Sequence, residues 1–141
     1  MIIISHRGNI NGPDIENENN PRFIQLALEN GYHCEIDVWL TPAGLFLGHD
    51  TPTYSINENF LKNERLWCHA KNIDALEFML LNDIHCFWHQ TDNCVLTSKG
   101  FIWTWEGKPL TPKSIACWID ANGPPPTNCY GICTDYPKLL N

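Results

Sequence analysis

The chain lacks long hydrophobic runs, since no segment approaches the 18 or so consecutive apolar residues of a membrane span. It is also poor in basic residues, with nine Lys and Arg against 16 Asp and Glu and a formal net charge of −7. This balance disfavours a basic face that coats phosphates, so we expect no stable nucleic-acid partner. Residues 1–5 contain no basic segment. We therefore expect no secretory signal, no membrane span and a cytoplasmic protein.

The seven cysteines include no C-x-x-C pair. A free thiol within an apolar run behaves as a small buried hydrophobic side chain. Because no export signal is expected, we favour core positions over a zinc site or disulfide bonds. The cysteines that lie within apolar, strand-like runs are Cys34, Cys68, Cys86, Cys117 and Cys133.

Strand-like and helix-like segments alternate in the first part of the chain. Asn20-Pro21 suits the start of a helix, and Asn30-Gly31 suits its end. Phe23, Leu26 and Ala27 are expected to form the buried face of that helix. A helix over 72–81 should likewise bury Ile73, Leu76 and Leu80, and a shorter helix is expected at 57–62. Strands are expected at 2–5, 33–40, 45–48, 66–71, 84–89, 101–105, 115–119 and 131–134.

This alternation favours an α/β fold with a mainly parallel sheet. The number of expected strands suggests a barrel, but a (β/α)₈ barrel usually takes about 250 residues. Several outer helices must therefore be missing from a chain of 141 residues, above all in its second half. We predict one domain over residues 1–141 with a compact TIM-barrel-like α/β fold whose outer helices are missing or shortened. Sheet surface left uncovered by helices predicts a homo-oligomer.

Three polar groups follow or interrupt apolar runs in the first third of the chain. Two carboxylates at a spacing of two point to the same side of a strand. Such a pair, with two histidines and an arginine nearby, suits a divalent cation and a phosphate. The groups are His6-Arg7-Gly8, Glu35-Ile36-Asp37 and His49-Asp50.

The four-residue link at 41–44 predicts a hairpin, because a parallel crossover needs a dozen or more residues. A turn centred on this link would place Glu35 opposite His49 and Asp37 opposite Leu47. All three polar side chains would then share one face of the sheet.

The order of these motifs resembles that of the glycerophosphodiester phosphodiesterase family, which reads H-R-G, E-N-T, E-x-D-V, T-x-D-G and H-D. Weaker similarities follow at 66–71 (E-x-K), at Trp103-Thr104 (W-T) and at 131–137 (G-I-x-T-D-x-P). The resemblance implies a TIM-type barrel and a metal-dependent phosphodiester hydrolase. The matching residues are His6-Arg7-Gly8, Glu18-Asn19, Glu35-x-Asp37-Val38, Thr41, Gly44 and His49-Asp50.

The resemblance also implies a role for each matching residue. Glu35 and Asp37 would bind Mg²⁺ or Ca²⁺, His6 and His49 would form the general acid–base pair, and Arg7 would contact the phosphate. The chemistry is consistent with this, because imidazole is the side chain that exchanges protons most readily near neutral pH. The expected partner is a small-molecule phosphodiester.

Three positions depart from the family pattern. Asn20 replaces the Thr of E-N-T, a mild change at a cap position, and Ala43 replaces the Asp of T-x-D-G, a structural position in the turn. The third departure lies in the site itself. The carboxylate of E-x-K is replaced by His69, while Lys71 is kept. His69 is either a third metal ligand, since imidazole binds metals, or a direct phosphate contact. Two other functions stay open. One is a metal-independent phosphodiesterase or cyclising lyase in which His69 and Lys71 hold the phosphate. The other is a phosphate-ligand binding protein without turnover.

The remaining polar and aromatic residues are less specific. Lys71 and Trp103 are expected on the substrate side, and alternation along a strand allows only one of Trp103 and Trp105 to line the pocket. Glu18 and Asn19 should close the loop over the site or cap a helix, and Asp135 should have a supporting role. His89 suits a site-lining or a structural position equally. His33 and His85, at the starts of their strands, should be non-functional.

Overall fold

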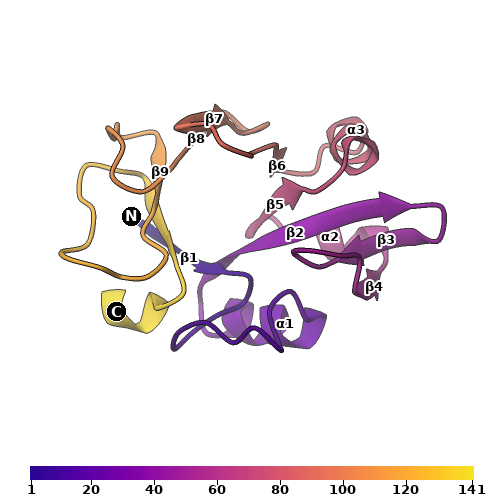
Figure 1. Ribbon diagram of the computed structural model, residues 1–141, viewed down its shortest axis with the longest axis horizontal. Coiled ribbons are helices and arrows are strands. Elements are labelled where there is room, and N and C mark those ends of the chain that lie inside the picture. Colours follow the sequence, from indigo (N-terminus) through magenta and orange to yellow (C-terminus); the bar gives the residue numbers. More distant parts are fainter.

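The computed structural model describes residues 1–141, whose strands all belong to one curled, mixed sheet (Figure 1). Its strands are β1 (Ile2–His6), β2 (His33–Thr41), β3 (Gly44–Leu47), β4 (Tyr54–Ile56), β5 (Leu66–Ala70), β6 (Cys86–Phe87), β7 (Cys94–Leu96), β8 (Ile102–Thr104), β9 (Ser114–Cys117) and β10 (Gly131–Thr134). The helices are α1 (Pro21–Glu29), α2 (Glu58–Leu61) and α3 (Ile73–Leu81), followed by a C-terminal 3₁₀ turn at Pro137–Leu140.

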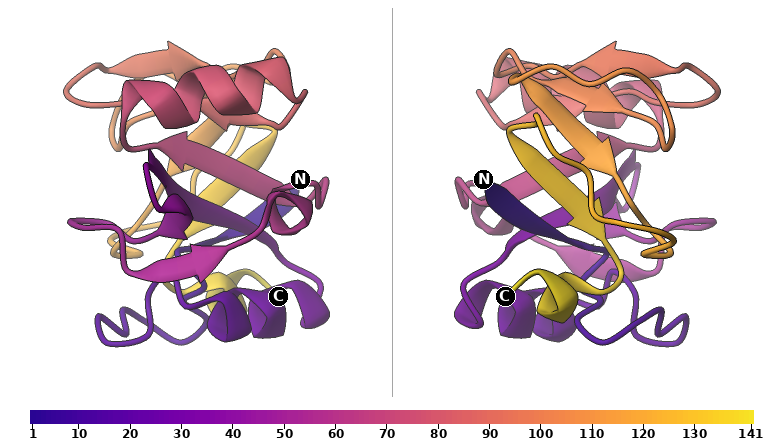
Figure 2. Two further views of the ribbon diagram at one scale, coloured as in Figure 1. Left: turned by 90° about the vertical axis from the view of Figure 1, so that its right-hand side faces the viewer. Right: turned by 90° about the vertical axis from the view of Figure 1, so that its left-hand side faces the viewer.

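Parallel pairing runs through the sheet in the order β6-β5-β2-β1-β10-β9-β8. The antiparallel strands β3 and β4 extend the far end of β2, and β7 pairs antiparallel with β8. No strand pairing joins β6 to β8, so the curled sheet stays open. Helices α1 and α3 lie on opposite sides of the molecule, with the C-terminal turn beside α1 (Figure 2).

The predicted compact TIM-barrel-like α/β fold is wrong. The chain forms a mostly β half-barrel of ten strands with only three short helices. A TIM barrel closes through eight strand–helix units, whereas here helices follow only β1, β4 and β5. The later crossovers, over 105–113 and 118–130, contain no helix. Strand β6 has only two residues, too few to carry a hydrogen-bonded ladder on to β8.

Alternation along the central strands separates a helix-covered face from a polar, inward face. Cys34, Ile36 and Val38 of β2 belong to the main hydrophobic cluster, which also contains buried residues of α1, α2 and α3. Glu35 and Asp37 therefore point to the other side, where the sheet curls in on itself. A second cluster fills the inside of the curl and consists of Ile4, Trp67, Phe87, Trp103, Ile115, Cys117 and Cys133.

The helix boundaries were predicted well and the buried faces poorly. Helix α1 begins at Pro21 with Asn20 as its N-cap, and α3 has the N-cap Asn72. Helix α1, however, buries Ile24, Ala27 and Leu28, and α3 buries Ala75 and Met79. Both helices contain apolar residues on several sides, so spacing alone did not identify the buried stripe. The apolar side chains left exposed include Leu26, Ile73, Leu80 and Leu81.

Most strands lie where they were expected, but two short strands, β4 and β7, were not among those expected. The five cysteines expected in the core are all buried, which confirms their assignment.

Exposed apolar surface on α3 is compatible with oligomerisation, which stays a prediction. The longest helices have nine residues each, and no helix has the length and apolar character that a bilayer crossing needs.

The predicted hairpin exists, but its register is shifted by one residue. Val38 pairs with Leu47 and Trp39 with Phe46, so Asp37 does not lie opposite Leu47. The turn is tighter than expected, because Thr41 already pairs with Gly44. His49 consequently lies beyond the end of β3, on a loop.

Candidate functional site

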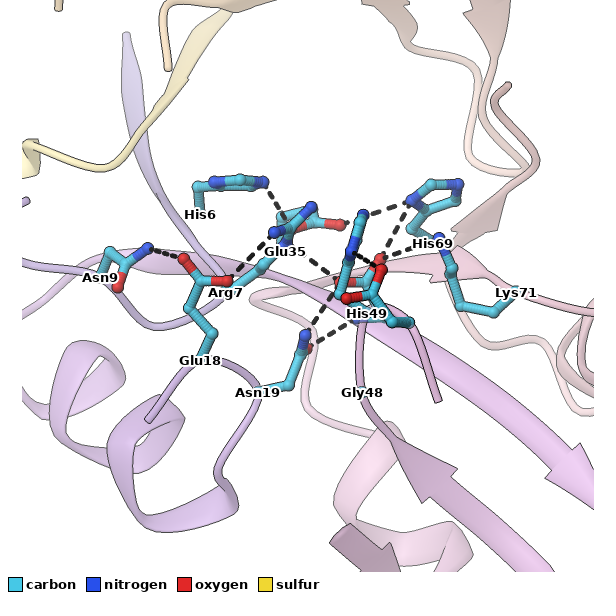
Figure 3. A network of polar contacts seen from close by, with 12 residues as sticks. His6, Arg7, Asn9, Glu18, Asn19, Glu35, Gly48, His49, His69 and Lys71 are labelled. Carbon is cyan, nitrogen blue, oxygen red and sulfur yellow. Dashed lines mark hydrogen bonds and ion pairs between the residues drawn. The ribbon is translucent and has the colours of Figure 1, made fainter. Parts of the chain in front are cut away.

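The candidate site lies where the carboxyl ends of β1 and β5 flank the first half of β2 (Figure 3). His6, the last residue of β1, pairs in register with Glu35 of β2. Asp37 of β2 pairs in the same way with His69 of β5. The backbone pairing alone therefore brings together four of the residues expected from the sequence, from segments far apart in the chain.

Both carboxylates of β2 are almost completely buried, with exposed fractions of 3% for Glu35 and 0% for Asp37. Glu35 Oε2 and Asp37 Oδ1 have no hydrogen-bond partner. A buried carboxylate oxygen without a partner is costly, because it has given up its hydration. Two such oxygens on one face of a strand indicate a place that a cation would stabilise.

The second oxygen of Asp37 is held by the loop that follows β1. Asn19 Nδ2 donates to Asp37 Oδ2 at 2.9 Å, and Asn19 Oδ1 accepts the backbone N–H of Asp37 at 2.9 Å. Arg7 Nε lies 3.2 Å from the same Oδ2. Burial alone would raise the pKa of Asp37, but His69 and Arg7 beside it lower that pKa to about 2. Asp37 is therefore an anion at neutral pH.

The pKa of Glu35 shifts in the opposite direction. Burial raises it, and the neighbouring negative charge of Asp37 raises it further. The two carboxylates thus repel each other at close range, and a divalent cation between them would relieve that repulsion.

His6 is oriented by the carboxylate of Asp135, the residue that directly follows the last strand, β10. His6 Nδ1 lies 2.7 Å from Asp135 Oδ1, while His6 Nε2 lies 3.9 Å from Glu35 Oε2. Burial alone would lower the pKa of His6, but the contact with Asp135 and the charge of Glu35 outweigh it and raise the pKa. Asn9 Nδ2 also donates to Asp135 Oδ1 at 2.8 Å. The Nδ1 atom of His6 is therefore occupied, and Nε2 is the atom free to exchange protons.

The turn that carries Arg7 has an uncommon backbone conformation. Arg7 has φ 55°, Gly8 φ 91° and, across the loop, Asn19 φ 63°. A Cβ on Gly8 would also meet Phe23 Cδ1 at 2.9 Å, so this glycine allows the loop to approach α1. Arg7 Nη1 is fixed by Glu18 Oε2 at 3.1 Å. A non-glycine residue held in this region by its surroundings is typical of functional sites.

His69 and Lys71 lie on the other side of the carboxylates. His69 Nδ1 is 3.2 Å from Asp37 Oδ1 and 3.8 Å from Glu35 Oε1. Burial alone would lower the pKa of His69, but the neighbouring Asp37 and Glu35 raise it. Lys71 Nζ is 3.9 Å from Asp37 Oδ1. Lys71 therefore adds a positive charge on this side of the site, and His69 adds a nitrogen atom beside the carboxylates.

His49 reaches the site from a loop. Its Nδ1 lies 2.8 Å from Asp50 Oδ1, and its side chain is 43% exposed. The preceding Gly48 permits the sharp path of this loop, since a Cβ there would meet the carbonyl oxygen of Thr51 at 2.0 Å. The carbonyl of Gly48 accepts the indole N–H of Trp39 at 2.7 Å, which anchors the loop to β2.

Two cavities meet at His6, Arg7 and His49. One, of about 530 Å³, extends along Trp103 and Trp105, and the other, of about 540 Å³, extends along the loop that follows β1. Both tryptophans line the first cavity, so the expectation that only one would do so is wrong. Strand β8 ends at Thr104, and strand alternation therefore does not govern Trp105.

Several supporting residues gain defined contacts that the sequence could not specify. Asp135 holds His6, Asn19 holds Asp37, and the backbone carbonyl of His89 lies 2.9 Å from His69 Nε2. His89 also lines the cavity with the tryptophans. A supporting role was expected for Asp135, which directly follows the last strand, and its contact with His6 identifies the residue that it supports.

His33 and His85 lie at the opposite, amino end of the sheet, as expected. They line a separate cavity of about 470 Å³ together with Trp67 and Phe101. Trp67 Nε1 donates to His33 Nδ1 at 3.1 Å, and His85 Nε2 lies 2.8 Å from Thr97 Oγ1. These contacts give both histidines a structural role.

His85 predicts a pH dependence of stability. Burial, with the nearby positive charge of Lys99, lowers the pKa of His85 to about 4. Between pH 4 and 6.5 His85 is thus neutral in the folded chain and protonated in the unfolded chain, so the free energy of unfolding falls as the pH falls. We expect the wild-type protein to lose about 1 kcal/mol more than His85→Gln between pH 6.5 and 4.5 in urea titrations. Equal losses in the two proteins would contradict this.

The residues that together could hold a metal ion are Glu35, Asp37 and His69. One donor atom from each lies within 4.8 Å of the other two. The unpartnered Glu35 Oε2 and Asp37 Oδ1 supply independent support, because buried anionic oxygens of this kind are satisfied by cations. The donor set therefore fits a divalent metal.

No protein-family model, curated protein or solved structure matches this chain. The resemblance to the glycerophosphodiester phosphodiesterase family rests on the quoted motifs alone and stays a prediction. The function of the chain is therefore inferred from the geometry and electrostatics of the site.

Proposed function

We propose that this chain is a metal-dependent phosphodiester hydrolase. His6 and His49 serve as the general acid–base pair, Arg7 and Lys71 contact the phosphate, and Glu35 and Asp37 hold a divalent cation. The observation that carries the proposal is the pair of unpartnered, buried carboxylate oxygens beside a histidine whose other nitrogen is held by Asp135. The family resemblance of the sequence points to the same chemistry.

A phosphodiester is an anion that repels nucleophiles, so its hydrolysis needs positive charge around the phosphoryl oxygens. Arg7 and Lys71 supply part of that charge from opposite sides of Asp37, at 3.2 Å and 3.9 Å from its oxygens. A bound divalent cation would add Lewis-acid stabilisation of the phosphoryl group. The cluster is thus suited to a substrate that carries a negative charge.

The two histidines provide the proton transfers. One imidazole accepts the proton of the attacking hydroxyl as the new O–P bond forms, and the other protonates the leaving alkoxide as the old P–O bond breaks. The attacking hydroxyl belongs to water or to the substrate itself. Attack by water gives a phosphomonoester and an alcohol, and internal attack gives a cyclic phosphate and an alcohol.

The two cavities suit a substrate with two alcohol groups on one phosphate. His6, Arg7 and His49 border both cavities, so a phosphate near these residues could extend one alcohol group into each. Trp103 and Trp105 line one cavity and favour an alcohol with some apolar surface on that side.

Turnover should depend on a divalent metal. We expect the purified protein to cleave bis-p-nitrophenyl phosphate and glycerophosphodiesters in the presence of divalent cations and to lose this activity in EDTA. Restoration by added metal, measured by p-nitrophenolate absorbance and by ³¹P NMR of the products, would support the proposal. The NMR spectrum also distinguishes a cyclic phosphate from a phosphomonoester.

Each alternative predicts a different result in the same assays. Activity that survives EDTA would favour a metal-independent phosphodiesterase or cyclising lyase, in which His69 and Lys71 hold the phosphate. Binding of a phosphodiester without turnover, in the presence of every metal tested, would favour a phosphate-ligand binding protein. Asp37→Asn is a useful companion variant, because it retains the side-chain shape while removing the charge that both metal and Arg7 contact.

A further inference from the structure

His69 occupies the position at which the sequence departs from its apparent relatives, and its ring has a defined orientation. Its Nε2 lies 2.9 Å from the carbonyl oxygen of His89. A carbonyl oxygen only accepts hydrogen bonds, so Nε2 carries a proton. The ring also stacks on Phe87, with centroids 5.2 Å apart and planes inclined by 9°. The remaining nitrogen, Nδ1, is therefore held in a constant direction.

The Nδ1 atom of His69 is directed toward the two carboxylates. Nδ1 is 3.2 Å from Asp37 Oδ1 and 3.8 Å from Glu35 Oε1. Asp37 Oδ1 has no hydrogen-bond partner, even though the contact with Nδ1 is short. Donor atoms around a single cation, at ligand bonds of about 2.0–2.2 Å, are spaced about 3–4 Å apart. The two distances from His69 Nδ1 to the carboxylates are of that kind.

The His89 carbonyl completes a pattern that is common at metal centres. A histidine that binds a metal through one ring nitrogen usually donates its other N–H to a carboxylate or a backbone carbonyl, which fixes the tautomer. Here the carbonyl comes from the segment after β6, one strand beyond His69. This second contact favours metal ligation by His69 over direct phosphate contact.

The charge of the site argues against a hard cation. Mg²⁺ and Ca²⁺ prefer oxygen ligands only. The negative charge of Asp37 is already shared with Arg7 at 3.2 Å and Lys71 at 3.9 Å, which weakens the attraction of a hard ion. A neutral nitrogen donor adds affinity for transition-metal ions without adding charge.

We infer that His69 Nδ1 is the third ligand and that the site selects a divalent transition-metal ion such as Mn²⁺, Co²⁺ or Zn²⁺ over Mg²⁺ and Ca²⁺. This inference rests on the proposed function, because it starts from the divalent-metal site proposed there on Glu35 and Asp37. The family resemblance implies Mg²⁺ or Ca²⁺, whereas a nitrogen ligand from His69 favours transition-metal ions.

The direct test is pulsed EPR of the metal-stripped protein loaded with Mn²⁺. A coordinated imidazole adds ¹⁴N modulation to the Mn²⁺ echo. We expect this modulation in the wild-type protein and its loss in His69→Glu, which restores an all-oxygen donor set. His89→Gln is the matched control, because it removes a neighbouring imidazole of the same cavity while keeping the backbone carbonyl, and it should retain the modulation. A wild-type protein that binds no Mn²⁺, or binds it without nitrogen modulation, overturns the inference.

Metal selectivity gives a second readout. We expect calorimetric titrations to show at least 100-fold tighter binding of Zn²⁺ than of Mg²⁺ in the wild-type site, and at least a tenfold smaller ratio in His69→Glu. All proteins should carry Cys94→Ser, because Cys94 is the one exposed cysteine and would bind Zn²⁺ by itself. An unchanged ratio would argue against ligation by His69. His69→Gln, which removes the donor without adding charge, replaces His69→Glu if the latter does not fold.

The outcomes separate this inference from the proposed function. Nitrogen modulation in a protein that hydrolyses no phosphodiester would support the metal site and overturn the hydrolase. Metal-dependent turnover by a Mn²⁺-loaded protein that lacks the modulation would support the hydrolase and overturn the role of His69.

Discussion

Replacing His6 by alanine is expected to lower kcat for phosphodiester cleavage by about 10³-fold, because general acid–base catalysis by a positioned histidine is worth about 10²–10⁴. His6 is half-buried at the end of β1, and its Nδ1 is held by Asp135 at 2.7 Å. Only Nε2 is then directed toward Glu35 and the cavities. The measurement is kcat under saturating substrate and metal, with metal binding determined separately to show that the site still loads.

A matched control is His33→Ala. His33 is also a half-buried histidine of the sheet, but it lies at the opposite end and lines another cavity. Its replacement should leave kcat within a factor of about two. Partial recovery of His6→Ala by added imidazole would support a proton-transfer role over a purely structural one. Unchanged kcat in metal-loaded His6→Ala would contradict the proposed mechanism.

The leaving group distinguishes the acid from the base. A p-nitrophenolate leaves without being protonated, whereas an alkoxide needs a proton from the general acid. The histidine that acts as the acid should therefore matter greatly for a glycerophosphodiester and little for bis-p-nitrophenyl phosphate. Comparing His6→Ala and His49→Ala on both substrates assigns the two roles. A large, equal loss on both substrates in both variants would exclude an acid role for either histidine.

Replacing Asn19 by alanine is expected to lower the free energy of unfolding by about 3 kcal/mol. Asn19 is completely buried and makes two hydrogen bonds to Asp37, one to the carboxylate and one from the backbone N–H. Alanine would leave both groups of Asp37 without these partners. It would also occupy φ 63°, a conformation that asparagine tolerates better than alanine. Urea titrations measure the loss.

Asn17→Ala is the control for this variant. Asn17 lies in the same loop but is exposed, and its side chain donates a hydrogen bond to Asp14 at 2.9 Å. We expect its replacement to change the free energy of unfolding by less than about 0.5 kcal/mol. If Asn19→Ala cost less than about 1 kcal/mol, the loop would not depend on its contact with Asp37. A parallel loss of metal affinity in Asn19→Ala would show that the loop also orients that carboxylate.

Much of the candidate site could be predicted because its signals are local. The spacing of Glu35 and Asp37 determines that they share a face, and the apolar residues around them determine that the face is part of a strand. His6 and His69 could be placed near them because parallel strands present their carboxyl ends at one edge. The helix starts at Asn20 and Asn72 could be predicted for the same reason, since a cap involves only neighbouring residues.

Other features depended on where a strand ends, on the length of a turn or on contacts between distant segments. Trp103 and Trp105 share a cavity only because β8 ends between them, and the hairpin after β2 is shifted by one residue because Thr41 already pairs with Gly44. The register of a hairpin depends on the length of its turn, and the turn that forms is tighter than the one expected. Side-chain partners such as Asp135 for His6 are set by the meeting of the first and last parallel strands.

The sequence by itself determined most of the strands, the helix caps and the set of ionisable residues that carry the proposed chemistry, because each depends on residues close together in the chain. The tertiary structure decided that the sheet stays an open, mostly β half-barrel, because β6 is too short to pair onward and the later crossovers lack helices. It also decided the direction of each site nitrogen and oxygen. Above all, the carbonyl of His89 turns His69 Nδ1 toward Glu35 and Asp37, a contact between β5 and the segment after β6 that no local pattern encodes.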